Sequence, residues 1–240
     1  ANLSKTSKPL EANGSYTAKI KMKPQFTYLM SDGTTGFFRA TTFGGGSKIP
    51  IAVVINQDKG LAVALKDAGK VWWTLLNPST WQTTNAVYSS AALVAAENGY
   101  AQTWDGATTM NGQVKATSTN FPAFKAIGDY NPGVPLTGAL AGKKWYMPAS
   151  GEWKYAYPLG CCEQPITTSN WYKWYGRLAD IAFTQVGGTE LVGNNNDKWY
   201  CASTEYGASH ASGMAFRNHS LTISYGDKNV DQFSRAFIKY

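Results

Sequence analysis

Hydrophobic positions in the first quarter of the chain follow the patterns of β-strands. Residues 15–22 alternate between apolar and polar side chains, which is typical of a strand with one buried face. A further strand is expected over residues 25–30. Residues 49–55 are almost continuously apolar, as in a strand buried on both faces, and residues 61–65 are apolar again after a polar turn. The last two runs predict a β-hairpin, because the short loop between them is within the usual range for hairpins.

Apolar residues recur at helical spacing in the middle of the chain. The pattern predicts helices over residues 85–98 and 110–119, with a short continuation over 121–127 that contains a proline. Two more helices are expected over 150–157 and 170–186, each with a serine at or just before its start. The middle of the chain is therefore predicted to be helical, and not a regular alternation of strands and helices.

The last fifth of the chain is expected to form short strands. Residues 189–240 are rich in Gly, Ser, Asn and Tyr, and apolar residues recur there in short groups. Strands, then helices, then strands is the order typical of an α+β fold with antiparallel sheets. Because a single strand cannot fold alone, residues 1–24 are interpreted as an N-terminal strand and linker, and residues 25–240 as the main domain.

Composition and charge exclude several classes of protein. Only 15% of the 240 residues are charged, but 14% are aromatic, and large aromatic side chains supply a substantial core. The net charge is +7, yet the basic residues are scattered, so no nucleic-acid partner is expected. No apolar run approaches the length that spans a bilayer, so no transmembrane segment is predicted. The polar N-terminus is expected to follow an export signal that has already been removed.

The few cysteines and histidines argue against catalysis. Cys161 and Cys162 are adjacent and lack the C-x-x-C spacing of zinc or redox sites. A disulfide from either of them to Cys201 and three free thiols are both open interpretations. His210 and His219 are the two histidines of the chain, and both lie in its polar C-terminal part. We therefore expect no enzyme, no metal site and no cofactor.

Two segments are more specific than composition. The first, residues 144–153, reads K-W-Y-M-P-A-S-G-E-W, and the second, residues 199–206, reads W-Y-C-A-S-T-E-Y and is followed by S-R-A-F at 234–237. This ordered set resembles C-type-lectin-like modules of the FISUMP type, which are related in fold to formylglycine-generating enzymes. Residues 51–67 also resemble the early hairpin of that family. The resemblance covers residues 26–240.

The resemblance implies a compact C-type lectin fold without lectin chemistry. The positions that match are Trp145, Pro148, Glu152 and Trp153 in the first motif, and Ser203, Thr204 and Glu205 in the second. We interpret the tryptophans as core and the two glutamates as acceptors for backbone amides. The cysteine context of the related enzymes and the sugar-coordinating signatures of calcium lectins are both missing. Residues 194–197 offer oxygen ligands for calcium, although a polar turn is the commoner meaning of such a run.

The C-terminal segment is the most informative about function. Residues 206–234 mix aromatic anchors with small hydrogen-bonding residues, as adaptable binding surfaces do. In some members of this fold the same stretch is diversified by retroelements that mutate adenines, and the composition is compatible with that. A polar β-meander without a partner is the alternative. The candidate ligand-binding residues are Tyr206, Ser209, His210, Ser212, Met214, Arg217, Asn218, His219, Tyr225, Asn229 and Asp231, with help from the 189–198 loop.

The function predicted from these features is recognition at a cell surface. Residues 10–20 resemble the last strand of fimbrillin-like domains, which precede lectin-like modules in surface proteins of Gram-negative gut anaerobes. We therefore expect an extracellular, adhesin-type module that binds a protein or glycan on another cell, with fimbrial subunits as further partners. The alternatives are a structural fimbrial or pilus subunit, and an enzyme of the formylglycine-generating or carbohydrate-active kind.

Overall fold

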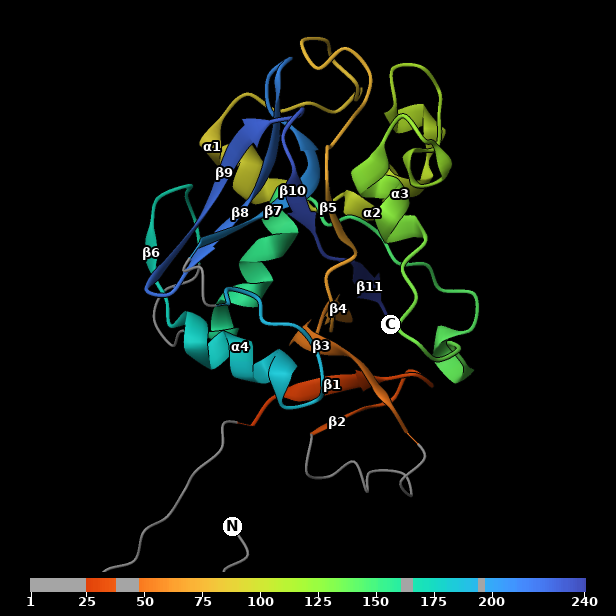
Figure 1. Cartoon of the computed structure of the whole chain (residues 1–240), viewed down its shortest axis with the longest axis vertical. Helices are drawn as coiled ribbons and strands as arrows, with labels where there is room; N and C mark the ends of the chain where they lie inside the picture. Colours follow the sequence, from red (N-terminus) through yellow and green to blue (C-terminus); the bar gives the residue numbers. More distant parts are fainter. Residues whose placement is uncertain (1–24, 38–47, 161–165, 194–196) are drawn as a thin grey trace, which may run out of the picture.

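The computed structural model describes residues 25–37, 48–160, 166–193 and 197–240 (Figure 1). Within them the fold is α+β, with two sheets whose strands pair antiparallel except for one parallel contact between β7 and β10. The strand predicted over 15–22 lies outside the described residues, as do Cys161, Cys162 and the turn at 194–196. In Figure 1 the red and orange strands of the first sheet lie below the blue strands of the second.

The first sheet contains the predicted N-terminal strands and the end of the chain. Its order is β11-β4-β3-β1-β2. The hairpin predicted from the two apolar runs is confirmed, because β3 and β4 pair antiparallel. The bounds of the strands are β1 (Thr27–Met30), β2 (Thr35–Phe37), β3 (Pro50–Asn56), β4 (Leu61–Ala64) and β11 (Phe237–Lys239).

The second sheet has the order β5-β10-β7-β8-β9-β6. Strands β7, β8 and β9 follow one another along the chain and form an antiparallel meander, and they are longer than the short strands expected from the sequence. Only Arg235 and Ala236 separate β10 from β11, so the chain passes directly from this sheet to the first one. The bounds are β5 (Gly69–Val71), β6 (Tyr172–Lys173), β7 (Asp197–Glu205), β8 (His210–Arg217), β9 (Ser220–Asp227) and β10 (Gln232–Ser234).

Three of the predicted helices are shorter than expected, whereas the one expected over 150–157 is present as a 3₁₀ helix that continues to Leu159. The helix expected over 85–98 is wrong at both ends: it begins after Ser89, whose hydroxyl accepts the amide of Ala92, and Val87 instead forms a bridge with Tyr206. The bounds are α1 (Ser90–Ala95), α2 (Gly99–Trp104), α3 (Pro122–Gly128), α4 (Gly176–Thr184), and the 3₁₀ helices η2 (Gly106–Thr108), η3 (Lys115–Thr117), η4 (Gly138–Leu140) and η5 (Ser150–Leu159).

Turns and strands replace other predicted helical turns. The helix expected over 110–119 is wrong, because a turn at Gly112 with φ +73° interrupts it and only the short η3 forms. The short continuation over 121–127 is the separate helix α3, with Pro122 in its first turn, where no amide donor is needed. The helix expected over 170–186 loses its first turns, since Tyr172 and Lys173 pair with β9 as β6.

The helix η5 joins the two sheets through the hydrophobic core. It contacts β3 of the first sheet and β7, β8 and β9 of the second. Its Trp153 is fully buried, and the ring lies 4.7–5.5 Å from those of Tyr200, Phe216 and Phe237. The prediction that Trp145 and Trp153 belong to the core is confirmed, since both are buried. This core holds one face of the β7–β9 meander against η5.

Candidate functional site

The predicted binding residues divide between the interior and the surface of the meander. Side chains alternate between the two faces of a strand, and β8 turns Ser212 and Met214 inward. Both are fully buried: the Ser212 hydroxyl donates to the backbone oxygen of Thr204 at 2.7 Å, and Met214 packs in the core around Trp153. These two residues are therefore corrected from ligand-binding to structural, because the polar composition of the segment does not reveal which face is covered.

One group of candidates lies at the end of the meander where β8 begins. The rings of Tyr206 and Tyr225 stack with centroids 4.2 Å apart, and the His210 ring meets that of Tyr225 edge-on at 5.4 Å. The Nε2 atom of His210 is 3.3 Å from a carboxylate oxygen of Asp227. Ser209 is partly exposed beside this cluster. The structure therefore brings three of the predicted anchors together in an accessible aromatic group.

Other candidates lie far from that aromatic group. Asn218 and His219 form the turn between β8 and β9, where their backbone oxygens accept the amides of Gly176 and Trp174. At about 3.4 Å per residue, the eight residues of β8 put this turn about 24 Å from the aromatic group. Asn229 and Asp231 are exposed in the connection between β9 and β10, at the opposite end from the turn. The predicted residues therefore do not form one compact site.

A depression of about 420 Å³ lies on the outer face of the meander, and this volume is within the range of about 300–1,000 Å³ typical of ligand pockets. Strand register explains its composition, because Asp197 is opposite Arg217 and Ser224 is opposite Gly213, on the face turned away from the core. Trp171 from the segment before β6 completes one side. The lining residues are Trp171, Asp197, Trp199, Ala215, Arg217, Thr222 and Ser224.

Arg217 is held in place at one side of the depression. Its guanidinium carbon lies 4.2 Å from the ring centre of Trp171, within the distance of a cation–π interaction. Its NH2 and Nε atoms lie 3.2 and 3.3 Å from the same carboxylate oxygen of Asp197. About half of each side chain stays exposed: 48% for Arg217, 52% for Asp197 and 50% for the whole of Trp171. The group is therefore ordered by its own contacts and still accessible to a ligand.

Trp199 forms the floor of the depression, and two glycines make room for it. A Cβ atom added to Gly213 would lie 2.9 Å from two carbons of the Trp199 indole, and one added to Gly226 would lie 3.7 Å from the same ring. The indole therefore lies across strands β8 and β9, where side chains at these positions would otherwise stand. Its buried Nε1 atom has no hydrogen-bond partner among the described residues. The floor is apolar, because Trp199 and Ala215 line it and the two glycines beneath the indole carry no side chains.

Both lining tryptophans were missed by sequence reasoning, and Thr222 and Ser224 lie in the segment 206–234 but were not among the candidate residues. Trp171 was expected inside a helix over 170–186, and Trp199 was interpreted as an apolar position of a short strand. For Trp199 a signal did exist: in a strand with Tyr200 facing the core, the alternation turns Asp197, Trp199 and Cys201 to the other face. No local pattern indicates that Trp171 approaches Arg217, since they are far apart in sequence.

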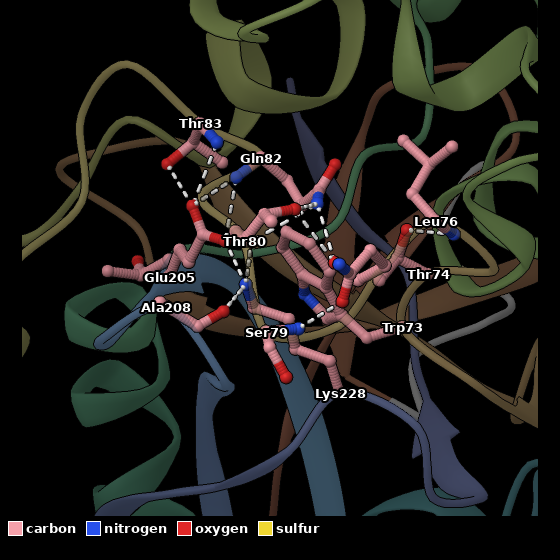
Figure 2. Close-up of polar contacts among 12 residues, drawn as sticks. Trp73, Thr74, Leu76, Ser79, Thr80, Gln82, Thr83, Glu205, Ala208 and Lys228 are labelled. Carbon is pink, nitrogen blue, oxygen red and sulfur yellow. Dashed lines mark hydrogen bonds and ion pairs between the residues drawn. The ribbon is translucent and has the colours of Figure 1, made fainter.

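The two motif glutamates are buried and hold backbone amides, as predicted. Glu205 accepts the amides of Gln82 and Thr83 at 2.8–3.0 Å and forms an ion pair with Lys228 (Figure 2). Figure 2 shows the Lys228 ammonium between Glu205 and the backbone oxygens of the loops around it. Glu152 accepts the amide of Ala149 at 2.7 Å, and burial raises the pKa of its carboxyl to about 7. In both motifs, the glutamate therefore anchors a loop by accepting its backbone amides.

Further features limit the chemistry of the described residues. Cys201 is a free thiol, and burial raises its pKa to about 12, so it is neither ionised nor accessible at neutral pH. Within the described parts of the chain, no cluster of three or more His, Cys, Asp or Glu side chains is arranged to hold a metal ion. In the same ranges, no helix combines the length and hydrophobicity needed to cross a membrane.

Comparison with known proteins yields no relative: no family model, curated protein sequence or solved structure matches this chain. The resemblance of its motifs to C-type-lectin-like modules therefore stays a prediction. Function has to be inferred from the depression on the meander and from the aromatic group at its end.

Proposed function

We propose that the protein is an extracellular ligand-binding module with a C-type-lectin-like fold, which recognises a protein or glycan on another cell. The ligand is received by the outer face of β7, β8 and β9. The observation that carries the proposal is the depression in which Arg217 lies over Trp171 and is paired with Asp197. Trp and Arg are the residue types that dominate binding energy at interfaces.

The arrangement suits recognition because it is ordered before a ligand arrives. The floor is built on three paired strands whose other face is packed on Trp153 and the core. Arg217 already has a partner on each side, so little side-chain freedom is lost on binding. The buried network of Glu205 and Lys228 anchors the far end of β7 to the loop at residues 80–83. A rigid sheet with exposed anchors supports binding better than catalysis.

The aromatic group of Tyr206, His210 and Tyr225 is a second surface at the end of the meander. Its rings stack on one another, and the side of Tyr225 that faces solvent is free to contact a partner. It lies on the face of β8 and β9 opposite the depression, because β9 alternates Ser224 with Tyr225. One small ligand therefore cannot contact both surfaces, and only a large partner would reach around the sheet end.

The experiment that tests this function is panning of the immobilised protein against a random peptide library and a glycan array. The affinity of each retained ligand is then measured for two variants. The double variant Trp171→Ala and Arg217→Ala tests the depression, and Tyr225→Ala tests the aromatic group. Trp72→Ala is the matched control, since Trp72 is a comparably exposed tryptophan beside β5, at the other edge of the sheet. We expect the first variant to lose affinity at least about tenfold and the control to keep it. Retention of no ligand, or of ligands that neither variant weakens, would contradict the proposal.

The two alternative functions have less support in the described residues. A structural fimbrial subunit would depend on the strand predicted over 15–22, which lies outside them. An enzyme would need an accessible nucleophile or carboxylate pair, but Cys201, Glu152 and Glu205 are all buried. The panning experiment separates these functions from recognition, because neither requires a ligand at the depression.

A further inference from the structure

We infer that the depression on the outer face of β7–β9 binds a neutral sugar ring, by stacking on tryptophan and without a metal ion. This rests on the proposed recognition function and names the class of ligand. Three properties of the depression support it: its apolar indole floor, the compensated charge at its side, and the hydroxyl group at its rim.

The floor matches the apolar face of a pyranose ring. The Trp199 indole packs on Gly213 and Gly226, and the depression above it is open, unlike the deep pocket that an aliphatic or aromatic side chain would fill. Trp171 adds a second indole, half of whose surface stays exposed beside Arg217. The axial C–H groups of a sugar ring pack on such indole surfaces, because the ring electrons carry partial negative charge on their faces.

The ion pair at the side matches hydroxyl groups and not a charged ligand. Arg217 supplies donors and Asp197, less than 4 Å away, supplies acceptors, so their charges compensate locally. A hydroxyl group both donates and accepts, and adjacent hydroxyls on a sugar therefore satisfy both partners at once. An anion would be attracted by Arg217 but repelled by Asp197 beside it, so the pair gives a charged ligand no net advantage. An apolar side chain would remove water from Asp197 and Arg217 without replacing their hydrogen bonds, at a free-energy cost.

The rim has one hydroxyl group that is suited to the same ligand. Ser224 is partly exposed and stands beside the floor, on the same face as Trp199. Thr222 is already engaged, because its hydroxyl donates to the backbone oxygen of Ser169 at 2.7 Å. A ring stacked on Trp199 would therefore be oriented by Ser224 on one side and by the pair of Arg217 and Asp197 on the other.

The test is titration of the chain with methyl glycosides of glucose, galactose, mannose and N-acetylglucosamine. Binding is monitored by tryptophan fluorescence and by saturation-transfer NMR. N-acetylneuraminic acid is the anionic comparison, and the amide of N-acetyltryptophan is the comparison for a protein side chain. We expect at least one neutral glycoside to bind, with an affinity unchanged by EDTA. Trp171→Ala should weaken it by about tenfold or more, and Ser224→Ala by a smaller factor. Trp171→Phe should retain part of the affinity, and Trp72→Ala all of it.

The result that would overturn the inference is no binding by any of the four neutral glycosides, or binding that Trp171→Ala leaves unchanged. Preferential binding of the anion or of the tryptophan amide would also overturn it. Failure here is distinguishable from failure of the proposed function: if peptides but no glycans are retained in the panning, and Arg217→Ala weakens them, recognition stands and the sugar does not. Circular dichroism of each variant confirms that it is folded, which is expected because Trp171 and Ser224 lie at the surface.

Discussion

Strand β7 carries an acidic residue at each of its ends, and the two have opposite surroundings. Asp197, the first residue, pairs with Arg217, and about half of each side chain is exposed. Glu205, the last residue, pairs with Lys228, and neither side chain is exposed at all. An ion pair between a carboxylate of this strand and a basic side chain is therefore found once at the surface and once in the interior.

The difference is one of hydration. A buried ion pair loses the water around both charges and is retained only if further hydrogen bonds replace it, as the amides of Gln82 and Thr83 do for Glu205. An exposed pair keeps most of its water and adds little to stability. That water can be exchanged for a ligand, whereas the partners of Glu205 cannot be replaced without unfolding the loop. Burial thus assigns one pair to the fold and leaves the other free for recognition.

The largest effect is expected from Glu205→Gln. It leaves the ammonium of Lys228 buried without its counter-charge, so the free energy of unfolding should fall by about 3–5 kcal/mol. Urea denaturation followed by tryptophan fluorescence measures the change. The double variant with Lys228→Met should recover part of the loss. A decrease as small as that of a surface pair would mean that burial does not distinguish the two ends.

The next effect has the opposite sign and comes from Lys115→Met. Burial lowers the pKa of the Lys115 ammonium from 10.5 to about 8, and it donates to the backbone oxygen of Gln102 at 3.2 Å. At pH 7 the charge is present in both states, and its desolvation cost is present in full. Lys115→Met should therefore stabilise the protein by about 1–3 kcal/mol at pH 7.

The pH dependence of that gain supplies its control. Between about pH 8 and pH 10.5 the folded chain loses the Lys115 proton before the unfolded chain does, so this group's contribution to the free energy of unfolding rises with pH. The advantage of Lys115→Met should shrink over this range. A gain that is constant with pH would indicate better packing and not removal of a charge.

Gly213→Ala tests the packing beneath Trp199, near the exposed end of β7, and is expected to destabilise the fold. The new Cβ atom would lie 2.3 Å from the backbone oxygen of Tyr200 and 2.9 Å from the Trp199 indole, so strand or ring has to move. Overpacking of this kind costs about 1–3 kcal/mol. Thermal unfolding measures that cost, and the fluorescence of the displaced Trp199 should change with it. Gly112→Ala is not a suitable control, because the φ of Gly112 is +73° and an alanine there would be strained. Ser220→Ala, in β9, is a suitable control.

The smallest change in stability is expected from Arg217→Ala. The exposed pair with Asp197 and the contact with Trp171 contribute about 0–1 kcal/mol together. Urea denaturation should therefore hardly distinguish this variant from the native chain, whereas we expect it to weaken the proposed ligand binding. A decrease similar to that of Glu205→Gln would show that Arg217 has a structural role.

Elements with a strong local pattern were predicted, and those that depend on distant contacts were not. The β3–β4 hairpin follows from two apolar runs with a polar turn between them. The roles of Trp153 and Glu205 follow from motifs whose residue types suit a core and an amide acceptor. The helix over 110–119 failed because apolar spacing ignores the turn at Gly112. Ser212 and Met214 failed because composition does not say which face of a strand is covered.

The amino-acid sequence by itself determined the α+β order of elements, the hydrophobic strands and the residues able to form a core. These depend on the period of side chains along one segment, which is local information. Only the tertiary structure decided that Asp197 stands opposite Arg217, and that Trp171 closes the side of the depression. Strand register and the approach of separate segments are set by packing of the whole core, and no short stretch of the chain encodes them. Part of the fold could therefore be predicted from the sequence, whereas the candidate site could be located only from the pairing of the strands in the structure.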